Sequence, residues 1–410
     1  MKSYYLTYFA SCFLVLTWLS LRQSLGENCL IIQEDDRMNS LTAELQQRIS
    51  TLQNKLRTAD LEAYVITDQE DIWYFTNINY KPEQRPFVLI MYPDRKPLFV
   101  VPKLEVDHFT VPYFDYELDN YFDVTSKAGS NWYEVLGEHL KNFSRVGIEG
   151  NSQLLMTHFT SEINWVAKFI VQNQRMIKSE YELDKLQYVA DICSKVVKQT
   201  LKISRTGTKI VDTYKIAMQV GAEEMTKHFS LENRTINAVW PAEYSFMPHS
   251  IPDLNAAIGA GPNIDIALFV LQGYASECER TFFTEEPNKE QQTHFEQMMT
   301  ARQIFLDNLK PGNKASDIEK AVDEYFAEQG LLDNILHRPG HGIGLNNHEW
   351  PTLSLGNDSI LQENMVVSVE PAIYFQNQGG YRHSDTAVIT KNGYRLMTQA
   401  PTDLSELILK

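Results

Sequence analysis

Imidazoles and carboxylates recur in the C-terminal half of the chain at positions from which they could do chemistry. His341 stands between glycines in PGHGIGLNNHEWP, and His348 follows in the same segment. Glu277 lies in GYASECERTF, and Glu370 directly follows the apolar run MVVSV. Imidazole and carboxylate groups serve as divalent-metal ligands and as proton carriers. A carboxylate beside an apolar run is costly to bury unless it is paired, hydrogen-bonded or metal-bound, so Glu370 in particular indicates a site.

Further polar residues fall where buried strands are expected, namely His249 in FMPHS and the run RHSDT, which begins at Arg382. An isolated histidine on a strand is usually a structural residue held by hydrogen bonds. Imidazole nevertheless titrates near neutral pH, which suits general acid–base work. The guanidinium of Arg382 suits substrate binding through paired hydrogen bonds. The catalytic candidates are therefore His249, His341, His348, Glu277 and Glu370.

The apolar pattern predicts the elements that must position these residues. Apolar residues recur at helical spacing from Leu41 to Thr58, and the segments that follow read as buried strands. Those segments are LEAYVIT, FVLIMYP, PLFVVP and RVGIEGN. This alternation of helix and strand up to about residue 170 predicts an α/β domain.

The pattern changes after a long amphipathic helix over residues 177–203, for which Ser179 is the expected N-cap. Two strands joined at Gly273 follow, and then two helices, the second of which is expected to end at Gly330. The last seventy residues return to strands in MVVSVEPAIYF and YRHSDTAVITKNGYRLMT. Helices packed on an antiparallel sheet are therefore expected in the second half of the chain.

The length, net charge and cysteine content of the chain limit its number of domains and the classes of partner it can bind. A chain of 410 residues exceeds the usual limit for one core, so two domains are expected. A net charge of −16, without a cluster of Lys and Arg, excludes a nucleic-acid partner. Four scattered cysteines, Cys12, Cys29, Cys193 and Cys278, are too few for a disulfide scaffold or a CxxC metal site.

The first 37 residues differ in kind from the rest. Lys2 precedes the 18-residue apolar run YYLTYFASCFLVLTWLSL, and Ser24 to Gly26 offers a small-x-small cleavage site. This leader predicts export through a cleaved signal, or contact with a membrane if it is an uncleaved anchor. Alternatively, Met38 is the true start and the protein is cytoplasmic, because Met38 opens a segment that reads as the beginning of a domain. The sequence leaves both hypotheses open.

Three segments in order, GHGIGLNNHEWP, VSVEPAIYF and GGYRHSDTAVIT, resemble the C-terminal signatures of the pita-bread family. That family contains the proline dipeptidases, aminopeptidase P, methionine aminopeptidase and creatinase. The resemblance covers about residues 177–410, and residues 38–172 resemble the creatinase-type N-terminal domain more weakly. It implies an α/β N-terminal creatinase-like domain followed by an α+β pita-bread catalytic domain, assembled as a homodimer.

In the peptidases of this family, two aspartates, a histidine and two glutamates hold two divalent metals. The resemblance assigns the histidine to His341, the first glutamate to Glu370 and the second aspartate to Glu277. Ser384 stands where the second glutamate is expected, and Ile266 stands where the first aspartate is expected. The resemblance therefore implies a degenerate metal site.

Asp265, next to Ile266, could complete the metal set only if a β-bulge turned it toward the site, since adjacent strand residues face opposite sides. Two carboxylates and one neutral imidazole suffice for a single dication. We therefore expect no cofactor, or a single divalent metal of the Mn or Zn type held by His341, Glu370 and Glu277. We do not expect a two-metal site.

The departures from the peptidase pattern are similar to creatinase, which shares the fold and hydrolyses a C–N bond without metal. There a histidine shuttles the proton, and His249, 28 residues before Glu277, occupies the matching place. Glu277 and Glu370, with Arg382, would then bind a cationic small-molecule substrate. The first hypothesis is thus a metal-poor, creatinase-like hydrolase of C–N bonds. The alternatives are a one-metal Xaa-Pro dipeptidase acting on a dipeptide, and an inactive pita-bread protein that binds a partner.

Overall fold

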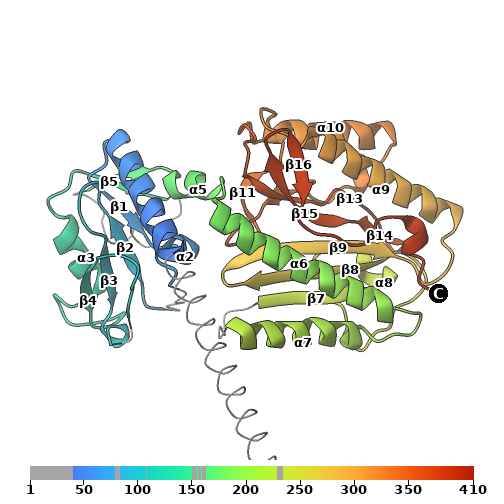
Figure 1. Cartoon of the computed structure of the whole chain (residues 1–410), viewed down its shortest axis with the longest axis horizontal. Helices are drawn as coiled ribbons and strands as arrows, with labels where there is room; N and C mark the ends of the chain where they lie inside the picture. Colours follow the sequence, from blue (N-terminus) through green and yellow to red (C-terminus); the bar gives the residue numbers. More distant parts are fainter. Residues whose placement is uncertain are drawn as a thin grey trace, which may run out of the picture.

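The computed structural model describes residues 40–78, 84–107, 109–149, 155, 158, 163–228 and 234–410. The predicted leader over residues 1–37 and the alternative start at Met38 lie outside these ranges. Two bodies, joined by helices, make up the described chain (Figure 1). Within these ranges, no helix combines the length and the apolar character that crossing a membrane requires.

A mixed sheet forms the core of the N-terminal body. Its strands are β1 (Ala63–Ile66), β2 (Val88–Met91), β3 (Leu98–Pro102), β4 (Glu117–Tyr121), β5 (Arg145–Ile148) and β6 (Asn164–Ala167). They are ordered β4-β3-β2-β1-β5-β6, and β1 pairs antiparallel with β2 and parallel with β5. Every residue of β1, β2 and β3 is buried, as expected for apolar runs covered on both faces.

Helices cover this sheet. They are a helix over residues 40–58, α2 (Gln69–Thr76), α3 (Trp132–Leu140) and the short 3-10 helix η1 (Lys103–Glu105). Asp68 caps α2 by accepting a hydrogen bond from the backbone N–H of Asp71. The first helix buries Leu45, Leu52 and Leu56. The predicted α/β body is therefore confirmed.

Two helices lead from the first body into the second. α5 (Ile170–Arg175) precedes α6 (Glu180–Ile203), which is green in Figure 1 and crosses the second sheet. Ser179 caps α6, and its side chain forms a capping box with Glu182, as the sequence predicted. α7 (Ile210–His228) then packs beside α6.

The second body is built on an antiparallel sheet, as predicted. Its strands are β7 (Arg234–Trp240), β8 (Asn263–Leu271), β9 (Tyr274–Phe282), β10 (His341–Gly342), β11 (Glu349–Thr352), β12 (Val366–Val369), β15 (Ser384–Thr390) and β16 (Gly393–Leu396), with a separate pair of β13 (Ala372–Phe375) and β14 (Gly379–Arg382). The sheet order is β11-β10-β12-β15-β9-β8-β7, with β16 on β15. α6 packs on β8 and β9, and α7 packs on β7. The remaining helices are α8 (Ala242–Ser245), α9 (Lys289–Asn308), α10 (Ala315–Glu328), η2 (Leu332–Asn334) and η3 (Leu404–Glu406).

Two segments predicted as continuous strands are interrupted at polar residues. VSVEPAIYF divides into β12 and β13 at Glu370 and Pro371, because a proline has no N–H to donate to the ladder. YRHSDTAVIT divides into β14 and β15 at His383. Glu370 therefore stands at the end of a strand, where its side chain can turn toward neighbouring strands.

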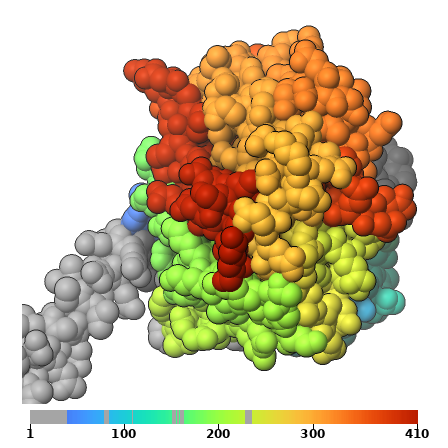
Figure 2. Space-filling view, turned by 90° about the vertical axis from the view of Figure 1, so that its right-hand side faces the viewer, coloured from blue at the N-terminus to red at the C-terminus, as the bar shows by residue number. Residues whose placement is uncertain are grey.

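The C-terminal segment closes the second body. Figure 2 shows it in red on the surface, between green and orange parts of the chain. The backbone N–H of Leu409 donates to the carbonyl of Phe283, and the N–H of Phe283 donates to the carbonyl of Leu407. The buried Arg280 donates to the carbonyl of Pro401 at 2.6 Å. These bonds make the segment part of the body.

Candidate active site

Three side chains on different strands of the second sheet converge on one point. Glu277 comes from β9, His341 from β10, and Glu370 from the end of β12. His341 Nε2 lies 3.2 Å from Glu370 Oε1 and 3.8 Å from Glu277 Oε1. One ligand atom of each residue lies within 4.8 Å of the other two, so a single cation could contact all three.

Neutral donors hold the carboxylate of Glu277. Ser384 Oγ donates to Glu277 Oε1 at 2.6 Å, and Ser368 Oγ donates to the same oxygen. Asn347 Nδ2 donates to Glu277 Oε2 at 2.9 Å. A carboxylate has about four acceptor positions, so these three bonds fix its orientation and leave room for one further partner.

His341 is buried, and its two nitrogens have different surroundings. Nδ1 lies 3.1 Å from the carbonyl oxygen of Gly342, which assigns the hydrogen of the neutral ring to Nδ1. Nε2 has no hydrogen-bond partner among the described residues, although two carboxylates lie within ion-pair distance. A buried polar atom in this state needs a proton or a cation to satisfy it.

The charges at this point shift the pKa of both kinds of group. Burial opposes charging of His341, but Glu277 and Glu370 outweigh it and raise the pKa of the imidazole to about 9. Burial alone would raise the pKa of Glu370, but the interaction with His341 lowers it to about 2. The neighbouring carboxylates therefore favour the protonated form of His341.

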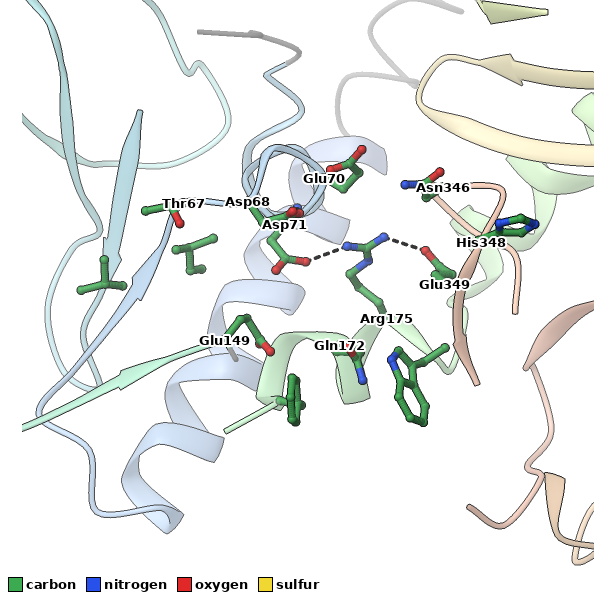
Figure 3. A pocket seen from close by; sticks show the side chains of 14 residues that line it. Thr67, Asp68, Glu70, Asp71, Glu149, Gln172, Arg175, Asn346, His348 and Glu349 are labelled. Carbon is green, nitrogen blue, oxygen red and sulfur yellow. Dashed lines mark hydrogen bonds and ion pairs between the residues drawn. The ribbon is translucent and has the colours of Figure 1, made fainter. Parts of the chain in front are cut away.

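His348 stands over His341 at the edge of a cavity between the two bodies. The two ring centroids are 4.0 Å apart, and the rings meet edge to face at 77°. Burial and the neighbouring His341 lower the pKa of His348, so its ring is neutral near pH 7 and can accept a proton. The cavity measures about 570 Å³, and Figure 3 shows Asn346 and His348 on one side of it and Asp68 on the other.

Comparison with protein families identifies both halves of the chain. The profile of metallopeptidase family M24 matches residues 184–391, and that of the creatinase/prolidase N-terminal domain matches residues 48–177. The chain belongs to metallopeptidase family M24. An Xaa-Pro dipeptidase of Lactobacillus delbrueckii subsp. lactis is 27% identical over 377 residues, covering 88% of this chain and 99% of the relative. A putative dipeptidase of Bacillus subtilis is 28% identical, covering 87% and 99%.

Solved structures share the fold of this M24 protein. Dipeptidase PepE from Mycobacterium ulcerans matches with a TM-score of 0.77 at 22% identity, covering 90% of this chain and 98% of that chain. The prolidase from Pyrococcus horikoshii OT3 matches with a TM-score of 0.73 at 24% identity, covering 87% and 99%. These matches confirm the predicted creatinase-like domain followed by a pita-bread domain. The family profile and the dipeptidase relatives confirm the predicted family of C–N hydrolases.

Family M24 implies divalent metal, and the residues of this site fit one ion. An imidazole nitrogen without a partner and two carboxylates are suitable ligands for such an ion. Ile266 is buried opposite Glu279 on the face of the sheet that carries Glu277, where it offers no ligand atom. Ser384 uses its hydroxyl to bond Glu277. The two positions that the resemblance assigns to further carboxylates therefore supply none.

Asp265 does not join this M24 site. Pairing between β8 and β9 is regular, with Asp265 opposite Arg280 and Leu268 opposite Glu277. Because side chains alternate along a strand, Asp265 points to the other face of the sheet, and no bulge turns it. Neither of its oxygens has a partner among the described residues, and burial raises its pKa well above the ordinary value. The expectation that Asp265 faces away from the metal ligands unless a β-bulge turns it agrees with this regular register.

His249 is also not where the sequence indicated. It lies in a turn over residues 246–249 that follows α8, and its side chain is exposed. The prediction that it belongs to a buried strand was wrong, because the chain leaves the sheet at Pro241. Burial lowers the pKa of His337, and Arg382 and, to a smaller extent, His249 act in the same direction. Its proposed role as proton carrier stays a prediction.

A second polar cluster beside the site was missed by sequence reasoning. His337 Nε2 lies 2.8 Å from Tyr374 Oη, and Arg382 Nη1 donates to the same oxygen at 3.0 Å. Arg382 also pairs with both carboxylate oxygens of Glu279, with one contact at 3.1 Å. Burial raises the pKa of Glu279 to about 8 despite this pairing, since Glu277 is also near. The guanidinium of Arg382 is thus engaged by the protein itself, and its predicted part in substrate binding stays untested.

A spacing signal for two members of this cluster is present in the sequence. Glu279 lies two residues after Glu277, which places both side chains on the same face of β9. His337 precedes His341 by four residues in HRPGH. Tyr374 carries no comparable signal, because a tyrosine in an apolar strand reads as a core residue.

Proposed function

We propose that this chain is a hydrolase of a C–N bond in dipeptide-sized substrates, with one cation bound by Glu277, His341 and Glu370. The observation that carries the proposal is the convergence of these groups. Nε2 of His341 faces two carboxylates and has no hydrogen-bond partner among the residues that the structure describes. The similarity to an Xaa-Pro dipeptidase makes a dipeptide with proline in second place the first substrate to test. A cavity of about 570 Å³ beside the centre has the size of a small-ligand site.

A divalent ion at this centre would polarise the scissile carbonyl group and lower the pKa of a bound water. The side chains of the protein hold the carboxylate ligand in place and exchange protons with the reacting groups. Ser368, Ser384 and Asn347 hold Glu277 in place, so its carboxylate does not have to reorient. The neutral His348, at the edge of the cavity, is placed to exchange a proton with the reacting groups.

A metal-free, creatinase-like hydrolase is the second candidate, and the hydrogen bonds to Glu277 favour it. Three neutral donors already occupy most of the acceptor positions of that carboxylate. A proton on His341 then offsets one of the two carboxylate charges without a metal, and the remaining negative charge is available to a cation. In this form, Glu277 and Glu370 bind a cationic group of the substrate, and His249 carries the proton.

Elemental analysis combined with an activity screen separates the candidates. The screen contains Xaa-Pro dipeptides and guanidino and amide compounds, each with and without added Mn²⁺ or Zn²⁺. One ion per chain, with activity lost on chelation, supports the one-metal hydrolase. Hydrolysis that persists after chelation supports the metal-free form. Two tightly held ions per chain would contradict both, and binding of a peptide without any turnover would indicate an inactive binding protein.

The variant His249→Ala tests the metal-free candidate directly. Because the side chain is exposed in a turn, its removal is expected to leave thermal unfolding unchanged. Loss of a general acid–base group typically lowers kcat by about 10²- to 10⁴-fold. A variant that keeps its kcat while losing stability would make His249 a structural residue and remove the proton carrier from this mechanism.

A further inference from the structure

A chain of buried ion pairs runs from the N-terminal body to the segment that carries His348. Arg175 Nη1 donates to Asp71 Oδ1 of α2 at 2.7 Å, and Arg175 Nη2 donates to Glu349 Oε2 at 2.6 Å. Lys178 Nζ donates to Glu349 Oε1 at 2.6 Å. Figure 3 shows Asp71, Arg175 and Glu349 in one line, with the arginine between the two carboxylates. The segment that carries His348 is thereby bonded to the first body as well as to the second body, to which it belongs.

Glu349 stands at the point where this chain meets the candidate active site. It directly follows His348 and begins β11, where it pairs with Gly342, the residue after His341. Its carboxylate also fills the space beside Gly344, since a Cβ on that glycine would lie 2.1 Å from Glu349 Oε1. A displacement of Glu349 would therefore move the backbone that carries both histidine rings.

The four side chains of this network of ion pairs are buried together. The side chain of Lys178 is 1% exposed, that of Asp71 6%, that of Glu349 9% and that of Arg175 12%. With both carboxylates ionised, they and the two cations sum to zero, whereas removal of one partner leaves a buried charge unpaired. Buried ion pairs of this kind contribute little net stability but can select one conformation over others.

We propose that Glu349 is a positioning residue for His348, and that Asp71 shares this task from the N-terminal body through Arg175. The first body thereby sets how His348 stands over His341. A small misplacement of a reacting group is costly in rate, so the proposal has a kinetic consequence. Only this kinetic consequence rests on the proposed function. The conformational consequence stands without it.

The variants Glu349→Gln and Asp71→Asn test the proposal, because each keeps the shape of the side chain and removes its charge. Glu182→Gln is the matched control. Glu182 Oε1 lies 3.5 Å from Arg48 Nη2 in another buried pair between the two bodies. Neither Glu182 nor Arg48 bonds the segment from 341 to 352 among the described residues. The control therefore disturbs the contact between the bodies without removing a hydrogen bond or ion pair of the segment that carries the histidines.

Hydrogen exchange measured by mass spectrometry gives a readout that needs no substrate. Exchange over residues 341–352 is expected to speed up in both Glu349→Gln and Asp71→Asn, although Asp71 lies in the other body. It is expected to stay at the parent level in Glu182→Gln. Unchanged exchange in Asp71→Asn would overturn the part of the proposal that concerns the first body, and unchanged exchange in both variants would overturn it entirely.

Kinetics on the full-length protein provide the second readout. Both variants are expected to lose roughly 10- to 100-fold in kcat/KM on the best substrate of the screen, mainly through kcat, while Glu182→Gln stays near the parent value. Because both act on Arg175, the double variant should lose less than the product of the single losses. Fully multiplicative losses would contradict the link. A parent protein without turnover, but with the expected exchange pattern, would reject the proposed function and leave this inference standing.

Discussion

Ser384 has the size and the hydrogen-bonding capacity to stand beside Glu277 without a metal. Its Oγ donates to Glu277 Oε1 at 2.6 Å and lies 3.2 Å from Ser368 Oγ. A carboxylate in its place would face Glu277 inside a buried site, and two such charges cannot both ionise without a cation between them. Ile266 likewise contributes apolar bulk where the resemblance places a ligand. These two residues allow the site to fold with one cation or with a proton.

The double variant Ile266→Asp with Ser384→Glu is therefore expected to gain a metal requirement. Elemental analysis should show a rise from at most one bound ion toward two. Thermal unfolding in a chelator should occur at a lower temperature than in the parent, and added Mn²⁺ should reverse the loss. Ser384→Ala serves as the control, since it removes a hydrogen bond worth about 1 kcal/mol and should not respond to metal. A double variant that unfolds identically with and without Mn²⁺ would contradict this view of the site.

At the scale of elements, the backbone at β10 packs directly against the backbone of β12 and of β11. A Cβ on Gly340 would lie 2.4 Å from the carbonyl oxygen of Ser368, and one on Gly342 would lie 2.4 Å from that of Trp350. Such contacts leave no room for a side chain. The glycines that flank His341 therefore let its strand lie close to the end of β12 and to β11, which carries the imidazole to the carboxylates.

The variant Gly342→Ala is expected to destabilise the second body, because the backbone atoms of Trp350 and Glu349 cannot move aside as a side chain could. Overpacking of this kind costs roughly 1–3 kcal/mol in the free energy of unfolding. Gly356→Ala is the control, since a Cβ there meets nothing within 4 Å. Its effect should stay within about 0.5 kcal/mol. Urea unfolding followed by tryptophan fluorescence measures both, and equal stability of the two variants would refute the packing argument.

At the scale of the whole molecule, buried charges join the two bodies. Burial raises the pKa of Asp71 to about 7, and the ion pair with Arg175 offsets only part of that rise. An aspartate in an unfolded chain has a pKa of about 3.9. Between these values the folded protein binds more protons than the unfolded chain, so Asp71 makes the free energy of unfolding fall as the pH rises.

As the pH rises from about 4 to about 7, the free energy of unfolding is accordingly expected to fall less in the variant Asp71→Asn than in the parent. Glu279 and Asp265, whose pKa values are also raised, remain in both proteins, so the difference in slope isolates Asp71. Chemical unfolding at several pH values measures this difference. Above pH 7 the two slopes should agree. Identical slopes across the whole range would show that Asp71 titrates at its ordinary value.

Many helices and strands of the protein can be predicted from short-range patterns in the sequence. The spacing of apolar residues predicted the helix over residues 40–58, and Ser179 predicted the start of α6. Motifs in order predicted that Glu277, His341 and Glu370 meet. Such signals are readable because a helix period or an N-cap depends only on residues a few positions apart.

Tertiary structure alone decided which charges neutralise one another. Glu279 engages Arg382 from 103 residues away, and Arg175 reaches Glu349 across 174 residues. Strand register placed Asp265 on the face opposite Glu277, and the break after β12 freed Glu370 to face His341. These partners are set by how distant strands and the two bodies pack together, and no local pattern encodes that packing. The sequence therefore determined the fold and three residues that meet in the candidate site, whereas long-range packing determined their electrostatic surroundings.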